Sequence, residues 1–210
     1  TQALKDRCDY ILLLINDVVV KKELFKSLNP YFNIKNVGIV SPLIAYYDNP
    51  QIIWCTHGYF NKKFVFTTYP FMNKYIHETS LPDTIESDFG AACLFINSKV
   101  FKKIGFLDER YFINVEDVEW CFRAKKAGFK LIYATKPLAL HKVSANTGIK
   151  GTNLLTPLSA YFYARNFFIF MRDHRDSLNL FTAIIGQTFI RLPFYILFRT
   201  RSLQATFQYI

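Results

Sequence analysis

Residues 87–134 read SDFGAACLFINSKVFKKIGFLDERYFINVEDVEWCFRAKKAGFKLIYA, a pattern that alternates between two kinds of element. The apolar run at 89–96 predicts a strand, whose small residues at 90–92 allow a ligand or another backbone to come close. Residues 98–104 predict a short helix with Ser98 as its N-cap and Gly105 at its end. Residues 115–127 predict an amphipathic helix that Gly128 ends, and residues 130–134 return to strand. This alternation predicts an α/β fold, in which helices cover a sheet.

The segments before and after this stretch extend the same sheet. Residues 10–15 are almost wholly apolar, as in a strand buried on both faces, which favours a mostly parallel sheet flanked by helices. Residues 37–40 predict a strand ended by Ser41-Pro42, and residues 138–141 a strand ended by His141. Residues 43–85 show no long periodicity, and we expect an irregular segment that carries binding loops.

Composition limits the class of protein without identifying it. The chain has 210 residues, 51% of them hydrophobic and 18% aromatic, so it is long and apolar enough to fold around a core. Its net charge of +10 suits nucleic acid, an anionic membrane surface or a phosphorylated ligand. The four cysteines form no CxxC pair, which argues against a zinc site or a disulfide framework and favours a reducing compartment.

The dipeptide Asn16-Asp17 follows the strand predicted at 10–15. Ligands of open α/β sheets bind beyond the carboxyl ends of the strands. A carboxylate there is placed to hold Mg²⁺ or Mn²⁺ against a diphosphate. The alternative is a simple turn, since Asn and Asp are common turn residues.

A second acidic pair, Glu116-Asp117, begins the helix predicted at 115–127. One interpretation is a general base that takes the proton from an attacking hydroxyl. The other is structural, because acids in a first helical turn complement the helix dipole and Asn114 fits an N-cap. His141, at the end of a strand, is likewise either a hydrogen-bonded structural residue or a metal ligand.

Taken together and in this order, these segments resemble family 2 glycosyltransferases, in particular their bacterial rhamnosyltransferase-like branch. The likeness covers about residues 1–170, and the run at 88–148 is highly specific. Five stretches carry it: LLLINDVVV (12–20), SDFGAACLFINSKVFKKIGFLDERYF (87–112), INVEDVEWCFRAKKAGFKLIYA (113–134), LALHKVSANTG (138–148) and YFYARNFFIF (161–170). The resemblance implies a GT-A fold, with a Rossmann-like sheet that binds a nucleotide-diphosphate sugar and a divalent cation, Mg²⁺ or Mn²⁺. It also implies an inverting transfer of the sugar to a hydroxyl of a growing cell-surface glycan.

The resemblance assigns a role to each matching residue. Asp117 is the expected catalytic base, with Glu116 beside it, and the expected metal ligands are Asp17 and His141. The remaining positions are expected on the substrate side of the site: Asn16 beside the metal, Asp88 and Gly90 along the acceptor or sugar, and Trp120 and Arg123 supporting the helix of the base.

Two departures from the family pattern keep alternatives open. The acidic motif at 16–17 has one carboxylate where the family often has two, and the strands that hold the nucleotide base precede this motif in the family. We therefore expect an N-terminally truncated enzyme, with a catalytically inactive remnant as the alternative. A basic nucleic-acid-binding module is a more distant alternative, because the basic residues are scattered and no nucleic-acid-binding motif occurs. A processive polysaccharide synthase is disfavoured because the sequence has no Gln-x-x-Arg-Trp motif.

The character of the chain changes after residue 156. We expect a GT-A part at 1–156 and an aromatic, amphipathic helical appendage at 157–210. In the helix predicted at 178–198, apolar residues fall on one face, and Asn179, Thr182, Gln187 and Arg191 fall on the other. This pattern favours a helix lying on the cytoplasmic face of a bacterial inner membrane, where arginines meet anionic headgroups. Those arginines are Arg172, Arg175, Arg191, Arg199 and Arg201. The alternatives are a core helix and a true membrane span.

Overall fold

The computed structural model describes residues 2–143, 155–200, 204 and 207, which form two compact units. Unit 1 comprises Thr1–Tyr59, Tyr69–Leu107 and Trp120–Lys142, and unit 2 comprises Phe60–Thr68, Asp108–Glu119 and Val143–Ile210. Neither unit is one continuous stretch of chain. Two segments from the first 156 residues, Phe60–Thr68 and Asp108–Glu119, therefore belong to the unit that holds the C-terminal helices. The domain boundary at 156 stays a prediction.

Unit 1 is built on a mixed sheet whose main strands follow the order β1-β8-β3-β9-β2. These strands are β1 (Tyr10–Leu14), β8 (Cys93–Asn97), β3 (Val37–Tyr46), β9 (Lys130–His141) and β2 (Val18–Val20). Strand β4 (Ile53–Cys55) pairs with β3, and β7 (Thr84–Ser87) pairs with β9. In the described part of the chain only β3 and β9 run parallel, and every other pairing in this sheet is antiparallel.

The prediction of a mostly parallel sheet is therefore wrong. It rested on the apolar run at 10–15, interpreted as a strand buried on both faces. In the structure β1 is an edge strand, and its terminal residues Tyr10 and Leu14 are 36% and 39% exposed. An apolar run is thus also compatible with a half-covered edge, which leaves strand direction undetermined.

Two strands are longer than the sequence predicts. Strand β3 continues through Ser41-Pro42, where its pairing with β9 shifts register between Pro42 and Leu43. A register shift accommodates a proline because the residue without an N–H need not donate to the ladder. Strand β9 likewise runs unbroken through residues 135–137, where we had expected two separate strands. By contrast β8 begins at Cys93 rather than residue 89, just after Ala92 with its positive φ of 63°.

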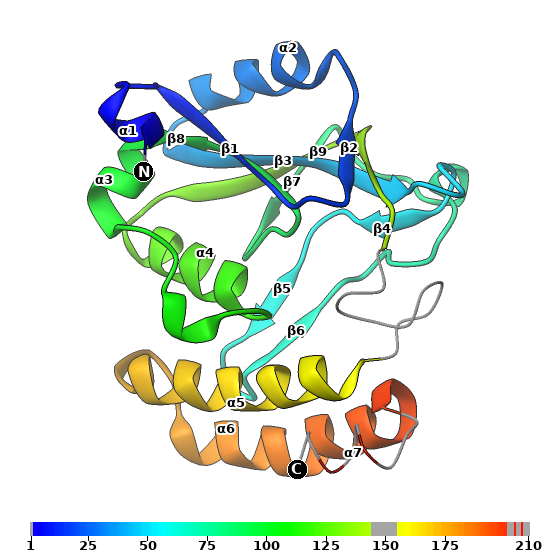
Figure 1. Cartoon of the computed structure of the whole chain (residues 1–210), viewed down its shortest axis with the longest axis vertical. Coiled ribbons are helices and arrows are strands. Elements are labelled where there is room, and N and C mark those ends of the chain that lie inside the picture. The colour runs from blue at the N-terminus through cyan, green and yellow to red at the C-terminus, as the bar shows by residue number, and fades with distance from the viewer. Residues whose placement is uncertain (1, 144–154, 201–203, 205–206, 208–210) are drawn as a thin grey trace. The chain divides into compact units, whose positions relative to one another are not determined.

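Short helices cover the sheet of unit 1: α1 (Gln2–Lys5), α2 (Leu24–Leu28), η1 (Asn29–Asn33), η2 (Ile76–Glu78), α3 (Ser98–Ile104) and the part of α4 (Glu116–Lys126) from Trp120 onward. Helix α2 and the later turns of α4 lie on opposite faces of the sheet (Figure 1). Helix α3 ends at Gly105 as predicted, with φ of 76°. Its N-cap is Asn97, whose side chain accepts a hydrogen bond from Lys99 N, and not Ser98.

Unit 2 contains a hairpin and a pair of long helical segments. Strands β5 (Tyr59–Asn61) and β6 (Phe66–Thr68) form the hairpin, and η3 (Glu109–Tyr111) precedes the start of α4. Helix α5 (Pro157–Asp173) runs antiparallel to the segment formed by α6 and α7 (Figure 1). That segment consists of α6 (Leu180–Ile185), the π-helical η5 (Gly186–Arg191), α7 (Leu192–Tyr195) and η6 (Ile196–Thr200); η4 (Arg175–Ser177) links it to α5. The predicted C-terminal helical region is therefore present.

Candidate functional site

The first pair of candidate residues, Asp17 and His141, is in direct contact. His141 Nε2 lies 3.1 Å from Asp17 Oδ2, and the two side chains are 8% and 16% exposed. The backbone fixes this contact, because β2 pairs with the end of β9 in a register that sets Val18 opposite His141. The Lys142 N–H also donates to the Asp17 carbonyl at 2.9 Å. Asn16 lies beside Asp17 in the turn between β1 and β2, with its side chain exposed.

The surroundings of His141 favour a neutral imidazole. Burial lowers the pKa of His141, and the Asp17 carboxylate opposes that shift. The Trp54 ring packs edge-on against the imidazole, with 4.1 Å between ring centroids. Nothing in the sequence pattern had singled out Trp54, since a lone Trp in an irregular segment carries no local signal.

Asp17 and His141 have side chains of the kinds that bind divalent cations. Within the described residues, the buried Nδ1 atom of His141 has no hydrogen-bond partner. A neutral imidazole and a carboxylate are both metal-ligand types. Among the described residues no group of three or more His, Cys, Asp or Glu side chains could hold a metal. A cation bound here would need further oxygens from a ligand, as Mg²⁺ usually does with substrate phosphates.

The second pair, Glu116 and Asp117, occupies the first turn of α4 in unit 2. Both side chains are half-buried, and Asp117 Oδ1 accepts a hydrogen bond from the Val118 N–H at 2.7 Å. The buried Glu116 Oε2 has no hydrogen-bond partner among the described residues. The acids therefore sit side by side in a poorly solvated position.

Burial in this position weakens both carboxyl groups as acids. Burial raises the pKa of Glu116 to about 8, with a further contribution from the neighbouring Asp117 carboxylate. Burial also raises the pKa of Asp117, to about 6, and the Val118 N–H opposes that shift. Because two adjacent buried carboxylates repel each other, a single negative charge on the pair is favoured at neutral pH. A general base works best with a pKa near the working pH, so Asp117 is suited to that role.

The loop before this pair is strained and clamped. Phe112, Asn114 and Val115 have φ of 57°, 65° and 71°, a region that costs a residue other than glycine of order 1–3 kcal/mol. The fully buried Asn166 amide of α5 donates to the Tyr111, Ile113 and Asn114 carbonyls at 2.7, 2.8 and 2.6 Å. This one side chain holds the loop that leads into Glu116 and Asp117.

Two further contacts join α5 to the same region. Asn114 Nδ2 donates to Ser159 Oγ at 3.0 Å. Helix α4 begins at Glu116, so Val115 and not Asn114 directly precedes it, and the prediction of Asn114 as the N-cap is wrong. His174 Nε2, to which we assigned no role from sequence, lies 3.0 Å from Glu119 Oε1, and both side chains are buried. The sequence signal for these contacts was the Arg165-Asn166 dipeptide in the stretch YFYARNFFIF. Asn166 donates to the Tyr111 carbonyl, and Arg165 donates to the neighbouring Arg110 carbonyl.

Trp120 and Arg123 tie α4 to the end of α3 within unit 1. The Trp120 indole N–H donates to the Gly105 carbonyl at 3.0 Å, and the Trp120 side chain is fully buried. The Arg123 guanidinium donates to the Ile104 and Phe106 carbonyls at 2.5 and 2.8 Å. These contacts anchor the helix that bears the acidic pair; substrate contact by either residue stays a prediction.

Asp88 and Gly90 lie around the start of β8. The Asp88 carboxylate forms a salt bridge with Lys125, and the backbone N–H of Asp88 donates to the Gly58 carbonyl at 2.9 Å. Gly90 is packed so closely that a β-carbon there would lie 2.5 Å from Leu94 Cδ2. Contact of these two residues with a sugar or acceptor also stays a prediction.

The sequence is similar to several curated glycosyltransferases. It is 23% identical over 190 residues to the dTDP-rhamnosyl transferase RfbF of Shigella flexneri, covering 85% of this chain and 58% of that protein. It is 37% identical over 57 residues to the N-acetylglucosaminyl-diphospho-decaprenol L-rhamnosyltransferase of Mycobacterium tuberculosis, covering 27% of this chain and 19% of that protein. The low-salt glycan biosynthesis hexosyltransferase Agl10 of Haloferax volcanii is 28% identical over 78 residues, covering 37% of this chain and 24% of that protein. The chain thus spans little more than half the length of the Shigella relative and less of the others.

A solved structure and a family match complete the comparison. The crystal structure of GalNAc-T7 with UDP, GalNAc and Mn²⁺ aligns with a TM-score of 0.48 at 13% identity, covering 83% of this chain and 41% of that one. Residues 2–182 match the family described as "Glycosyltransferase like family 2". Because that match takes in most of the 210 residues, the chain belongs to glycosyltransferase family 2.

Proposed function

We propose that this chain forms the catalytic part of an inverting glycosyltransferase that moves rhamnose, or a similar hexose, from a nucleotide-diphosphate donor to a hydroxyl of a growing cell-surface glycan. The observation that carries the proposal is the acidic pair at the start of α4, where a strained loop leads into two carboxyl groups whose pKa values burial raises. The choice of rhamnose rests on the names of the Shigella and Mycobacterium relatives. The second of these names also motivates a lipid-linked glycan as acceptor, and we propose that transfer to it takes place at the cytoplasmic face of a bacterial membrane.

In this proposal Asp117 acts as the general base. Its carboxylate takes the proton of the acceptor hydroxyl while the acceptor oxygen bonds to the anomeric carbon and the nucleoside diphosphate departs. One displacement inverts the configuration and needs no nucleophile from the protein. In this scheme Glu116 holds the proton that the pair retains at neutral pH, which leaves Asp117 as the one charge of the pair. Asn166 acts through the loop it clamps, as a positioning residue.

Asp17 and His141 are the residues that would hold a divalent cation, which offsets charge on the diphosphate leaving group when bound. A cation held by both side chains would take the place of the 3.1 Å contact between His141 Nε2 and Asp17 Oδ2. Because two protein ligands are few, we expect donor and cation to bind together. The alternative function, an inactive remnant of such an enzyme, predicts no transfer by the natural protein with any nucleotide sugar.

The first prediction concerns the base. In the natural protein that contains this chain, Asp117→Asn should lower kcat by about 10²-fold or more, because an amide cannot accept the proton. Glu116→Gln is the matched control and should have a milder effect, since Glu116 is already neutral. Transfer kinetics with a panel of nucleotide sugars measure both. Near-normal turnover of Asp117→Asn would leave Asp117 as a structural residue of the helix.

The second prediction concerns pH. Because the pKa of Asp117 is raised to about 6, the base is protonated below that value and ionised above it. We expect kcat/KM to fall by about tenfold per unit as pH drops below that pKa, and to level off above it. Glu116→Gln should keep this acid limb, because Glu116 is neutral throughout that range. A kcat/KM that stays flat from pH 5 to 8 would contradict the assignment.

The third prediction concerns Asn166. Asn166→Ala removes the donor that faces three carbonyls, so the strained loop should relax and misplace Asp117. We expect kcat to fall by about tenfold or more with little change in the KM for donor, since displacements near 1 Å can cost about 10²-fold. Asn179→Ala is the matched control, because Asn179 caps α6 by accepting from Thr182 N in the same unit. It should lower the unfolding temperature without lowering kcat; equal kcat in the two variants would reduce Asn166 to a stability role.

The fourth prediction concerns the cation. EDTA should abolish transfer, and Mn²⁺ or Mg²⁺ should restore it. Asp17→Ala and His141→Ala should each raise the metal concentration needed for half-maximal activity by about tenfold or more, the size reported for groups that support a metal site. Donor binding measured by calorimetry gives a readout besides activity. Full transfer in EDTA would refute the metal assignment, and unchanged metal dependence in His141→Ala would return His141 to a structural role.

A further inference from the structure

We propose that the outward face of the α6–α7 segment is a docking surface for the headgroup region of an anionic lipid bilayer, on which the segment lies flat. This inference concerns a binding partner and does not depend on the proposed reaction. The outward face is defined by large apolar side chains that are at least 48% exposed: Phe181, Ile184, Phe189, Phe194, Leu197 and Phe198.

The segment has its polar and apolar faces reversed relative to an ordinary surface helix. A surface helix of a globular domain turns its apolar stripe to the core. Here Thr182 Oγ1 donates to the Lys63 carbonyl at 2.6 Å, and Gln187 Nε2 donates to the Phe64 carbonyl at 3.2 Å. Thr182 and Gln187 therefore face the protein, whereas the phenylalanines of the segment are exposed; Tyr195 is the aromatic residue that is buried, at 8% exposure.

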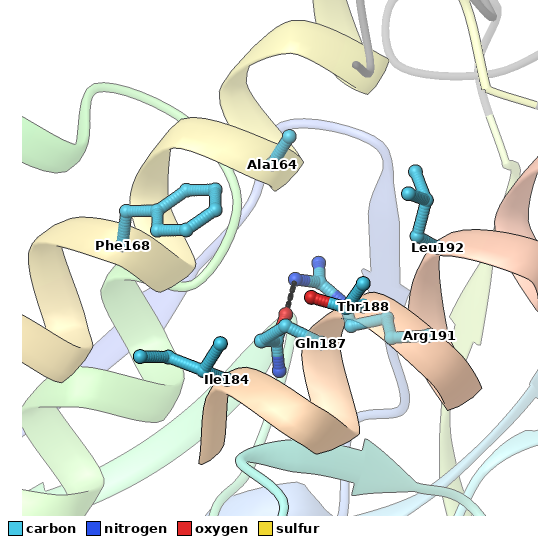
Figure 2. Close-up of a pocket in the computed structure, with 7 residues that line it drawn as sticks. All are labelled: Ala164, Phe168, Ile184, Gln187, Thr188, Arg191 and Leu192. Carbon is cyan, nitrogen blue, oxygen red and sulfur yellow. Dashed lines mark hydrogen bonds between the residues drawn. The ribbon is translucent and has the colours of Figure 1, made fainter. Parts of the chain in front are cut away.

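Arg191 shows the reversal most clearly. Its side chain is 5% exposed, donates to Gln187 Oε1 at 2.6 Å and to the Tyr163 carbonyl at 3.1 Å, and lies 3.7 Å from the centroid of the Phe167 ring. Figure 2 shows the Gln187–Arg191 hydrogen bond beneath a groove whose walls include Phe168 and Ile184. The sequence-based expectation that Arg191 meets lipid headgroups is therefore wrong, since its guanidinium is buried and hydrogen-bonded inside unit 2.

The burial of the segment argues against a core helix. The stretch Leu180–Arg199 is long and apolar enough to cross a membrane, with a mean hydropathy of 1.5, yet only 28% of its most apolar window is buried. An ordinary core helix with this composition would be mostly buried. The apolar face is thus available to a partner.

The attachment of the segment argues against a span. Gly186 lies so close to the β5–β6 hairpin that a β-carbon there would be 2.5 Å from the Phe64 carbonyl oxygen. Together with the Thr182, Gln187 and Arg191 contacts, this holds the segment along unit 2 at three successive turns. A helix held along its length presents one side to a bilayer, as interfacial helices do.

Charge identifies the kind of surface. Residues 157–210 contain six arginines, no lysine and two aspartates. Arg172 in the last turn of α5 and Arg175 in η4 are 64% and 71% exposed. Arg172 pairs with Asp173, and Arg175 lies 4.0 Å from Asp176, so the positive charge of this region comes from the excess of arginines over aspartates. Arg201 lies outside the described residues. Exposed aromatics next to an excess of arginine match a bilayer with anionic headgroups.

The test is cosedimentation of the natural protein with vesicles of phosphatidylcholine, with and without phosphatidylglycerol, in the absence of any sugar donor. We expect binding to the phosphatidylglycerol vesicles, and a loss of at least about tenfold in affinity in the Phe181→Ser/Phe189→Ser variant. Phe25→Ser in α2, which removes a 50% exposed ring from unit 1, is the matched control and should bind like the wild type. Arg172→Ala/Arg175→Ala should reduce the preference for phosphatidylglycerol.

Three outcomes would overturn the proposal. The first is wild-type vesicle binding by the Phe181→Ser/Phe189→Ser variant. The second is a lipid-free dimer that this variant converts to a monomer, which would make the face a contact between copies of the chain. The third is retention of the protein in cell membranes after a carbonate wash, which would indicate a span. Because no donor is present, none of these results depends on whether transfer occurs.

Discussion

Strand β9 pairs with β3 in parallel over most of its length and with β2 in antiparallel fashion at its end. This double pairing sets the register of Val18 against His141 and so brings Asp17 to the imidazole, although the two residues are 124 positions apart in sequence. A shift of one residue in β2 would turn its side chains to the other face of the sheet and separate the pair. The candidate metal site of unit 1 thus depends on backbone hydrogen bonding more than on the two side chains.

Unit 2 holds a loop with an unfavourable backbone conformation directly before two buried acids. Three residues with positive φ, one of them the β-branched Val115, together cost several kcal/mol. Net stabilisation from a hydrogen bond is about 1 kcal/mol. The two N–H bonds of the Asn166 amide are shared among three carbonyls, so they offset part of that cost without removing it. Strain retained in front of an ionisable pair is characteristic of functional sites, and it is this feature that distinguishes the start of α4 from an ordinary capped helix.

The C-terminal segment buries polar side chains and exposes apolar ones, which reverses the pattern of an ordinary surface helix. An arginine removed from water without partners would cost several kcal/mol, and here two hydrogen bonds and the aromatic rings around Arg191 compensate it. With its polar groups satisfied inside unit 2, the segment leaves aromatic side chains as its outer surface. Such a surface is costly in water and favourable against lipid, which is the physical basis of the docking proposal.

The sequence by itself determined the helices near residues 98 and 116 and the C-terminal helices, the place of Asp17 just after a strand, the acidic pair in a first helical turn, and membership of glycosyltransferase family 2. These features follow from local periodicity, turn residues and motif order, which act over a few residues. Only the tertiary structure decided that β1 is an antiparallel edge strand, that Asn166 rather than a capping box holds the loop before Glu116, and that Arg191 points inward. The physical reason is that periodicity reveals that a helix or strand has two faces, whereas long-range pairing and packing choose which face is buried and which strands become neighbours.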